Sequence, residues 1–231
     1  ANSINLGRLL PQAVYYAATS LGVWRQYGEP ASFVIPSGNL GNVAACIWAR
    51  KVGLPIGQIV LAHNANRTVP DYLDSGDWRP RPSIATLASA MDVGNPSNME
   101  RLRALFPDVR DMRGAVSAFT VNDDAIRARI RAGFTEFGQV WCPHTATAAE
   151  AFDRLCSARH GMPKQEGRWV VVATAHPAKF REIVESLIGR TIPVPETLAK
   201  LFARPTECTE IEADLGALRA ALGQRSPSWK S

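Results

Sequence analysis

Residues 33–42 read Phe-Val-Ile-Pro-Ser-Gly-Asn-Leu-Gly-Asn, an apolar run that leads directly into a glycine-containing turn. The apolar run at residues 33–35 predicts a buried strand, and the residues after the turn predict a helix over about 43–52. A second apolar run at residues 59–62 predicts another strand. A strand, a glycine turn, a helix and a further strand make a βαβ unit, which favours a parallel sheet.

The same pattern recurs twice further along the chain. Residues 169–173 predict a strand, Thr174-Ala175-His176-Pro177 follows it, and a helix is expected over 178–188 with Pro177 in its first turn. A third case joins a short strand at residues 139–141 to a helix that ends near residue 157. Three such turns predict a ligand site at the carboxyl edge of the sheet. The expected fold class is α/β, a mainly parallel sheet with helices on both faces.

The remaining segments predict helices and connections around that sheet. Ser3 is suited to cap a helix with apolar positions between Leu6 and Leu21, for which Gly22 is the expected end. Residues 67–113 are rich in Pro, Arg, Asp and Ser and predict loops with short helices. We expect residues 1–190 to form a large α/β domain and residues 191–231 to form a linker with a helical extension.

Composition narrows the functional classes. Hydrophobic residues make up 46% of the chain and the net charge is +5, which is typical of a packed protein whose surface attracts anions. No basic run is interleaved with aromatic residues, so nucleic-acid binding is not expected. The chain has four widely spaced cysteines and no apolar run long enough to cross a bilayer. We therefore expect reduced thiols, no membrane partner and a cytoplasmic location.

The turn at Ser37-Gly38-Asn39-Leu40-Gly41-Asn42 is suited to bind an anion. Glycines allow several backbone N–H groups to face one point, and the following helix presents its positive end there. The turn lacks the GK[ST] of a P-loop and is not GxGxxG, so ATP and dinucleotides are not favoured. By its spacing alone, an ordinary tight turn between a strand and a helix is an equal alternative.

Three further side chains have both a chemical and a structural interpretation. The hydroxyl of Thr174 at a strand end is able to bind a heteroaromatic nitrogen, or to cap the next helix. Arg8, in the first turn of the first helix, is able to clamp a phosphate or to lie on a solvated surface. His144 and His176 have no second ligand at metal spacing, so buried, hydrogen-bonded histidines are the favoured interpretation.

Several motifs together resemble threonine synthase, in the same order along residues 1 to about 220. They are Ala-Asn-Ser-Ile-Asn at 1–5 with Arg-Leu-Leu-Pro-Gln at 8–12, Pro-Ser-Gly-Asn-Leu-Gly-Asn at 36–42, Leu-Pro-Ile at 54–56, Ala-Met-Asp-Val at 90–93 with residues 95–101, Pro-His-Thr-Ala at 143–146 and Thr-Ala-His-Pro-Ala-Lys-Phe at 174–180. The resemblance implies a fold type II enzyme that uses pyridoxal phosphate (PLP) and converts O-phospho-L-homoserine and water to L-threonine and phosphate.

The resemblance also implies roles for individual residues. Ser37 to Asn42 (Ser37, Gly38, Asn39, Leu40, Gly41 and Asn42) would hold the PLP phosphate, Thr174 would face the pyridine nitrogen, and Asn5 and Arg8 would contact the substrate. The chain departs from the family at Leu40, where an aromatic residue is frequent, and at Arg67, where an acidic residue is frequent.

The largest departure from the family is a missing motif. The family's Schiff-base lysine lies in an amino-terminal segment resembling FKD, which is absent from these 231 residues. None of the five lysines present lies in such a motif: Lys51, Lys164, Lys179, Lys200 and Lys230. No catalytic residue is therefore assigned within the chain, which is expected to be inactive by itself. A non-catalytic homologue that binds PLP or phosphate, and an interaction module that retains the fold, remain as alternatives.

Overall fold

The computed structural model describes residues 5–157, 167–205 and 208–224, in two compact units that span residues 1–192 and 193–231. The second unit contains α9 (Glu196–Phe202) and α10 (Leu215–Gln224). The first unit contains, in chain order, α1 (Leu6–Tyr27), β1 (Ala31–Pro36), α2 (Gly41–Lys51), β2 (Ile56–His63), α3 (Thr68–Ser75), η1 (Ser89–Met91), α4 (Met99–Leu105), α5 (Val109–Ala115), β3 (Ser117–Thr120), α6 (Asp123–Phe137), α7 (Pro143–Ser157), β4 (Arg168–Val171), η2 (Pro177–Phe180) and α8 (Arg181–Ile188). No helix in the described ranges is long and apolar enough to cross a membrane.

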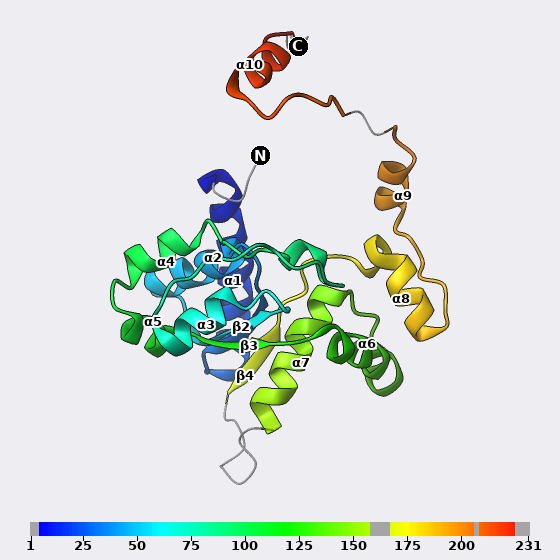
Figure 1. Cartoon of the computed structure of the whole chain (residues 1–231). Helices are drawn as coiled ribbons and strands as arrows, with labels where there is room; N and C mark the ends of the chain where they lie inside the picture. Colours follow the sequence, from blue (N-terminus) through cyan, green and yellow to red (C-terminus); the bar gives the residue numbers. More distant parts are fainter. Residues whose placement is uncertain (1–4, 158–166, 206–207, 225–231) are drawn as a thin grey trace. The chain divides into compact units, whose positions relative to one another are not determined.

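The first unit is built on one sheet with the strand order β3-β2-β1-β4 (Figure 1). Each pair of neighbouring strands is parallel, with Phe33 opposite Ile59 and Val34 opposite Val171. Because the strands all run in one direction, the turn after β1 and the turn after β4 lie at the same edge of the sheet. The predicted parallel sheet is confirmed.

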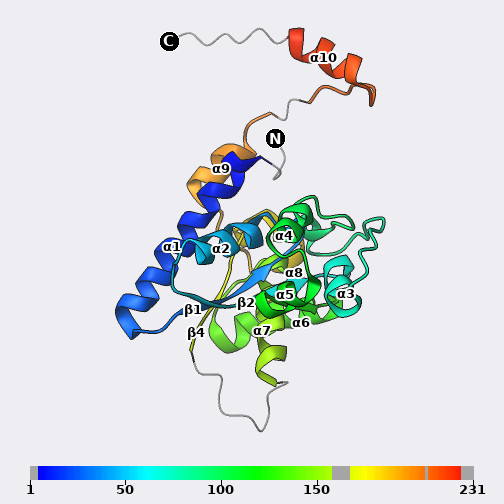
Figure 2. The same ribbon diagram turned by 90° about the vertical axis from the view of Figure 1, so that its left-hand side faces the viewer.

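Helices cover both faces of this sheet. In Figures 1 and 2, α2 lies above the strands and α7 lies below them. Alternate residues of β1 serve the two sides: Phe33 and Ile35 belong to a core cluster with residues of α2, while Val34 between them is fully buried on the opposite face, which α7 contacts. All six residues of β1 are buried. The α/β class with helices on both faces is therefore confirmed.

The strand predicted over residues 139–141 is wrong. This segment is irregular and turns back onto the end of α6, where the amide of Gln139 donates to the carbonyl of Gly133 at 2.9 Å. Trp141 stacks on Phe137 and lies so close to Gly133 that an added Cβ would come within 2.5 Å of its ring. The apolar residues are thus used for packing against a helix. The edge strand beside β2 is β3, a four-residue strand that the sequence did not predict.

The ends of α1 also differ from expectation. The helix does not stop at Gly22 but continues to Tyr27, and Gly28 ends it with φ 71° and a hydrogen bond from its amide to the carbonyl of Trp24. Asn5 caps the other end by accepting from the amide of Gly7 at 2.8 Å. The predicted cap, Ser3, lies outside the described residues. The helix is long enough to carry its first half along the edge of the sheet where the ligand turns lie.

Candidate functional site

A cavity of about 1060 Å³ lies where β1 and β4 end. Five segments that are distant in sequence line it: α1, the turn from β1 into α2, η1, the start of α7, and β4 with the residues after it. The lining residues are Arg8, Gln12, Tyr15, Tyr16, Thr19, Phe33, Pro36, Gly38, Asn39, Leu40, Gly41, Asn42, Val43, Ala90, Met91, His144, Val170, Val171, Val172, Ala173 and Thr174. The carboxyl edge of the sheet, where the sequence predicts a ligand site, therefore contains a cavity.

The turn that leads into α2 has backbone donors that no described residue accepts from. The amides of Gly38, Leu40, Gly41 and Asn42 donate to no acceptor among the described residues. Leu40 forms the N-cap with φ 62° and ψ 6°, and it is the one described non-glycine residue with positive φ. A buried leucine in this left-handed conformation is strained, which is characteristic of functional turns. Free amides at the positive end of a helix suit an anion.

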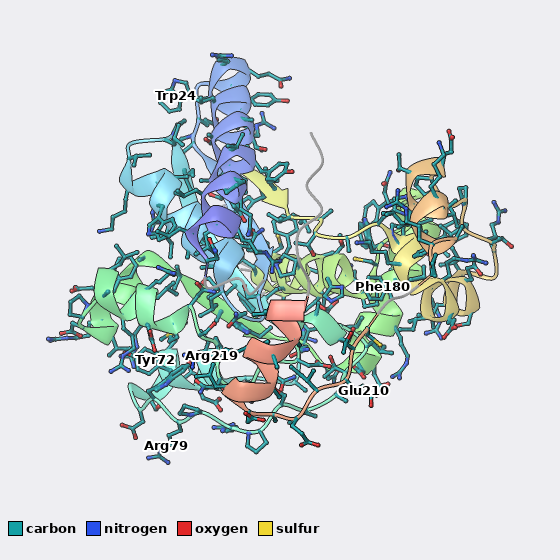
Figure 3. The ribbon with its side chains drawn as sticks, turned by 90° about the horizontal axis from the view of Figure 1, so that it is seen from above. Trp24, Tyr72, Arg79, Phe180, Glu210 and Arg219 are labelled. Atoms are coloured by element: carbon teal, nitrogen blue, oxygen red, sulfur yellow. The ribbon has the colours of Figure 1, made fainter. Side chains whose placement is uncertain are left out.

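The backbone of η1 packs closely against the turn at residues 37–42. A Cβ on Gly38 would lie 2.7 Å from Cα of Met91 and 3.0 Å from the carbonyl oxygen of Ala90, so only glycine fits there. Ala90 is held from the other side, because its amide donates to Nε2 of His144 at 3.1 Å. Phe180, labelled in Figure 3, places its ring 4.9 Å from the imidazole of His144.

His144 acts in this arrangement as a neutral hydrogen-bond acceptor. Burial lowers its pKa, although the nearby carboxylate of Asp92 opposes the shift. With Nε2 accepting from Ala90, the proton of the neutral ring lies on Nδ1, which is 3.9 Å from Sγ of Cys142. The imidazole therefore holds one wall of the cavity in place. The buried, hydrogen-bonded histidine expected from the sequence is found here.

Helix α1 contributes a row of polar side chains to the cavity. The side-chain amide of Asn42 donates to Oε1 of Gln12 at 3.0 Å, and the hydroxyl of Tyr16 donates to Oδ1 of Asn42. Burial raises the pKa of Tyr16, so its hydroxyl remains a donor at neutral pH. Arg8 lies one turn before Gln12 and lines the same cavity. These contacts join the turn at residues 37–42, here called the anion turn, to the helix that carries Arg8.

Thr174 lies on the cavity wall with its hydroxyl unused by the described residues. The helix after it is capped by His176, whose Nδ1 accepts from the amide of Ala178 at 3.1 Å. The alternative in which Thr174 caps that helix is therefore wrong. His176 is hydrogen-bonded but exposed, so the expectation of a buried histidine is wrong for this residue.

The structure brings most of the predicted site residues together, but not all of them. Ser37 is buried behind the turn, where its hydroxyl donates to Ile35 and its amide donates to Ala62, both at 2.8 Å. Asn5 caps α1 and does not line the cavity. Arg67 pairs with Asp71 at 2.7 Å and also lies outside the cavity.

Four lining residues of α1 were not assigned from the sequence. They follow Arg8 at helical spacing and so share one face of the helix: Gln12, Tyr15, Tyr16 and Thr19. That spacing is a signal by which they were detectable once Arg8 had been selected. The contributions of Ala90, Met91 and His144 depend on how η1 and α7 pack, and no local pattern marks them.

Two kinds of catalytic group are missing from the described cavity wall. Neither Lys51 nor Lys179, the lysines described in the first unit, lines it. The described ranges also hold no cluster of three or more His, Cys, Asp or Glu side chains suited to a metal ion. The described lining residues thus offer backbone donors suited to an anion, next to a hydroxyl that no described residue binds.

Comparison with known proteins defines the class. The family model described as pyridoxal-phosphate dependent enzyme matches residues 11–175, which include the anion turn and Thr174. The chain belongs to this family. Within it, residues 145–222 match the family model described as threonine synthase, C-terminal.

Individual relatives agree with that assignment. The chain is 37% identical over 228 residues to threonine synthase from Haemophilus influenzae and 35% identical over 223 residues to that from Escherichia coli. Each match covers 96% of this chain and 50% of the relative. The chain thus spans about half the length of the curated relatives that it matches.

Solved structures show the same relationship. The crystal structure of threonine synthase from Escherichia coli superposes with a TM-score of 0.82 at 32% identity, covering 97% of this chain and 51% of that one. The PLP-bound threonine synthase from Brucella melitensis gives 0.77 at 29% identity, covering 97% and 52%. The fold is therefore that of the fold type II PLP enzymes, as the motifs implied.

Proposed function

We propose that this chain is the carboxyl-terminal portion of a threonine synthase and that its cavity binds PLP. One observation carries the proposal: the amides at the start of α2 and the hydroxyl of Thr174, none of which bonds to a described residue, line a single cavity at the ends of two adjacent parallel strands. PLP has a phosphate at one end of its ring and a pyridine nitrogen across the ring from the aldehyde-bearing side. The wall offers a matching group for each.

The residues present fit this cofactor. The amides of Gly38 to Asn42 and the positive end of α2 hold the phosphate without any lysine. Ser37 supports the turn from behind through its bonds to β1 and β2. Thr174 hydrogen-bonds the ring nitrogen, and a hydroxyl partner leaves that nitrogen largely unprotonated, unlike an aspartate.

The proposed reaction converts O-phospho-L-homoserine and water to L-threonine and phosphate. When bound, PLP supplies an electron sink for the carbanions that this chemistry requires. Arg8 holds the substrate phosphate from α1, because its side chain lines the same cavity and a guanidinium binds phosphate through paired N–H groups. Asn5 is placed at the same helix end, and a contact with substrate would compete with its bond to Gly7.

The chain by itself is proposed to bind PLP without turnover. It contains no motif resembling FKD, and neither Lys51 nor Lys179 lines the cavity. The covalent chemistry of this cofactor needs a lysine amine, which we propose lies outside the 231 residues. For the isolated chain, the amides of the turn that bond to no described residue thus favour the second candidate function, PLP or phosphate binding without catalysis.

Titration of the purified chain with PLP and with inorganic phosphate tests the proposal. We expect saturable PLP binding that phosphate competes for, no absorbance of lysine-linked PLP, and no threonine from phosphohomoserine. Measurable turnover would show that one of the five lysines present is competent. Absence of binding by both PLP and phosphate would overturn the assignment of the cavity.

A further inference from the structure

The segment before α4 contacts the anion turn without lining the cavity, and the function proposed above leaves this segment without a role. Asn39, in the middle of the turn, is its point of attachment. Oδ1 of Asn39 accepts from the amide of Ser97 at 2.6 Å and from the hydroxyl of Ser97 at 2.9 Å. Nδ2 of Asn98 donates to the backbone carbonyl of Asn39 at 2.8 Å.

These bonds decide which backbone atoms of the turn remain free. Asn98 engages the carbonyl oxygen of Asn39, and the amide of Ala44 engages that of Leu40 at 2.9 Å. The amides of Gly38, Leu40 and Gly41 have no acceptor among the described residues. A carbonyl that faced the cavity would repel a phosphate. Because Asn98 and Ala44 bond these two carbonyl oxygens, the turn is left with N–H donors for an anion.

Asn98 is itself rigidly placed. It is fully buried, and its Oδ1 accepts from Nε of Arg101 at 3.0 Å. The guanidinium of Arg101 lies 5.9 Å from the ring centre of Trp48 in α2. The start of α4 thus contacts α2 at two places: Asn98 bonds the turn that precedes α2, and Arg101 lies against Trp48 within α2.

We propose that Asn98 and Ser97 are positioning residues, which present the amides of the turn to a phosphate. Asn98 is the main one, because its amide is the only described side-chain group that donates to a carbonyl of residues 38–42. This inference rests on the proposed binding of PLP at the turn. It assigns to Ser97 and Asn98 an action through Asn39, without contact to the ligand.

The test compares PLP with pyridoxal, which lacks the phosphate. In Asn98→Asp the side chain keeps its shape and its bond to Arg101 but loses the donor to Asn39, and it places a carboxylate oxygen against that carbonyl. We expect the purified chain to lose about tenfold or more in affinity for PLP, with affinity for pyridoxal unchanged. A merely structural role would weaken both ligands equally.

Asn122→Asp is the matched control. Asn122 caps α6 by accepting from the amide of Ala125 at 3.0 Å, and a carboxylate preserves that bond. The same chemical change is thus made away from the cavity, and both affinities should remain as in the unmodified chain. Ser97→Ala is a milder second variant, in case Asn98→Asp does not fold. It removes one of the two bonds to Oδ1 of Asn39 and should weaken PLP binding several-fold.

Hydrogen exchange gives a readout that needs no ligand. Loss of the bond to the carbonyl of Asn39 should loosen the first turn of α2, so the amide of Ala44, which donates to Leu40, should exchange faster in Asn98→Asp than in Asn122→Asp. If the unmodified chain binds neither PLP nor phosphate, the proposed function fails. Unchanged exchange at Ala44, or equal loss of PLP and pyridoxal affinity, overturns the positioning role alone.

Discussion

The side-chain amide of Asn42 lies 3.0 Å from Oε1 of Gln12 and joins the anion turn to α1. The other polar atom of the same side chain accepts from the hydroxyl of Tyr16. Because Gln12 and Arg8 are one turn apart on α1, this attachment sets the distance between the two groups proposed to hold phosphates. The cavity is thus organised by contacts between elements, each of which has a simple local pattern.

Replacing Gln12 tests how much its contact with Asn42 contributes to the free energy of unfolding. Gln12→Leu removes the acceptor of Asn42 while retaining similar volume, and the partner amide is only partly buried. We expect the free energy of unfolding to fall by about 1 kcal/mol in urea titrations. Gln26→Leu, at an exposed position of the same helix, should change it by less than about 0.5 kcal/mol. Equal effects of the two variants would show that the bond contributes nothing to stability.

Leu40 offers a test of backbone strain. Its side chain is 2% exposed, so truncation should destabilise the chain by about 2–4 kcal/mol. At φ 62° the left-handed conformation costs an alanine about 1–2 kcal/mol but costs glycine nothing. Leu40→Gly should therefore be more stable than Leu40→Ala, although glycine normally destabilises. Chemical denaturation of both variants decides this, and a more stable alanine variant would contradict a left-handed turn.

Substitution of Thr174 should affect ligand binding and leave the stability of the fold almost unchanged. Its hydroxyl bonds to no described residue, so Thr174→Val should change the free energy of unfolding by less than about 0.5 kcal/mol. In a full-length enzyme that contains this chain, the same change should lower turnover about tenfold, because the ring nitrogen loses its partner. Thr174→Ser retains the hydroxyl and should retain most of the activity. Full activity of the valine variant would remove Thr174 from the proposed site.

Acid should destabilise the chain through its buried histidines. Burial lowers the pKa of His63 to about 3, and its Nε2 has no hydrogen-bond partner among the described residues. The unfolded state takes up a proton near pH 6.5 and the folded state only near pH 3, so stability falls as the pH drops through that window. For this histidine the loss between pH 7 and pH 5 should be roughly 2 kcal/mol.

A non-titrating variant isolates that contribution. In urea titrations at pH 7 and pH 5, His63→Gln should show a smaller loss of stability than the unmodified chain. Gln26→Leu is the control, because Gln26 is exposed and carries no titratable group, so the acid dependence should remain that of the unmodified chain. An identical pH dependence of all three proteins would show that His63 does not carry the effect.

Local patterns predicted the fold where they were strong. The run at residues 33–35, the glycine turn and the helix after it lie next to one another in the chain, and β1 and α2 occupy those positions. The same reasoning failed at residues 139–141, where the two apolar residues Val140 and Trp141 are too few to distinguish a strand from a loop packed on a helix. It also missed β3, whose four residues are exposed or half-buried and carry no clear alternation.

The amino-acid sequence by itself determined the parallel α/β fold, the anion turn and the position of Thr174 at a strand end, since each follows from the order of neighbouring residues. Only the tertiary structure decided that Gln12, Tyr16 and Asn98 hold the turn. Tyr16 and Asn98 act on residues 26 and 59 positions away, respectively. Such contacts form only when α1, α2 and α4 have packed, because hydrogen bonds between side chains depend on distances in space and not on spacing along the chain.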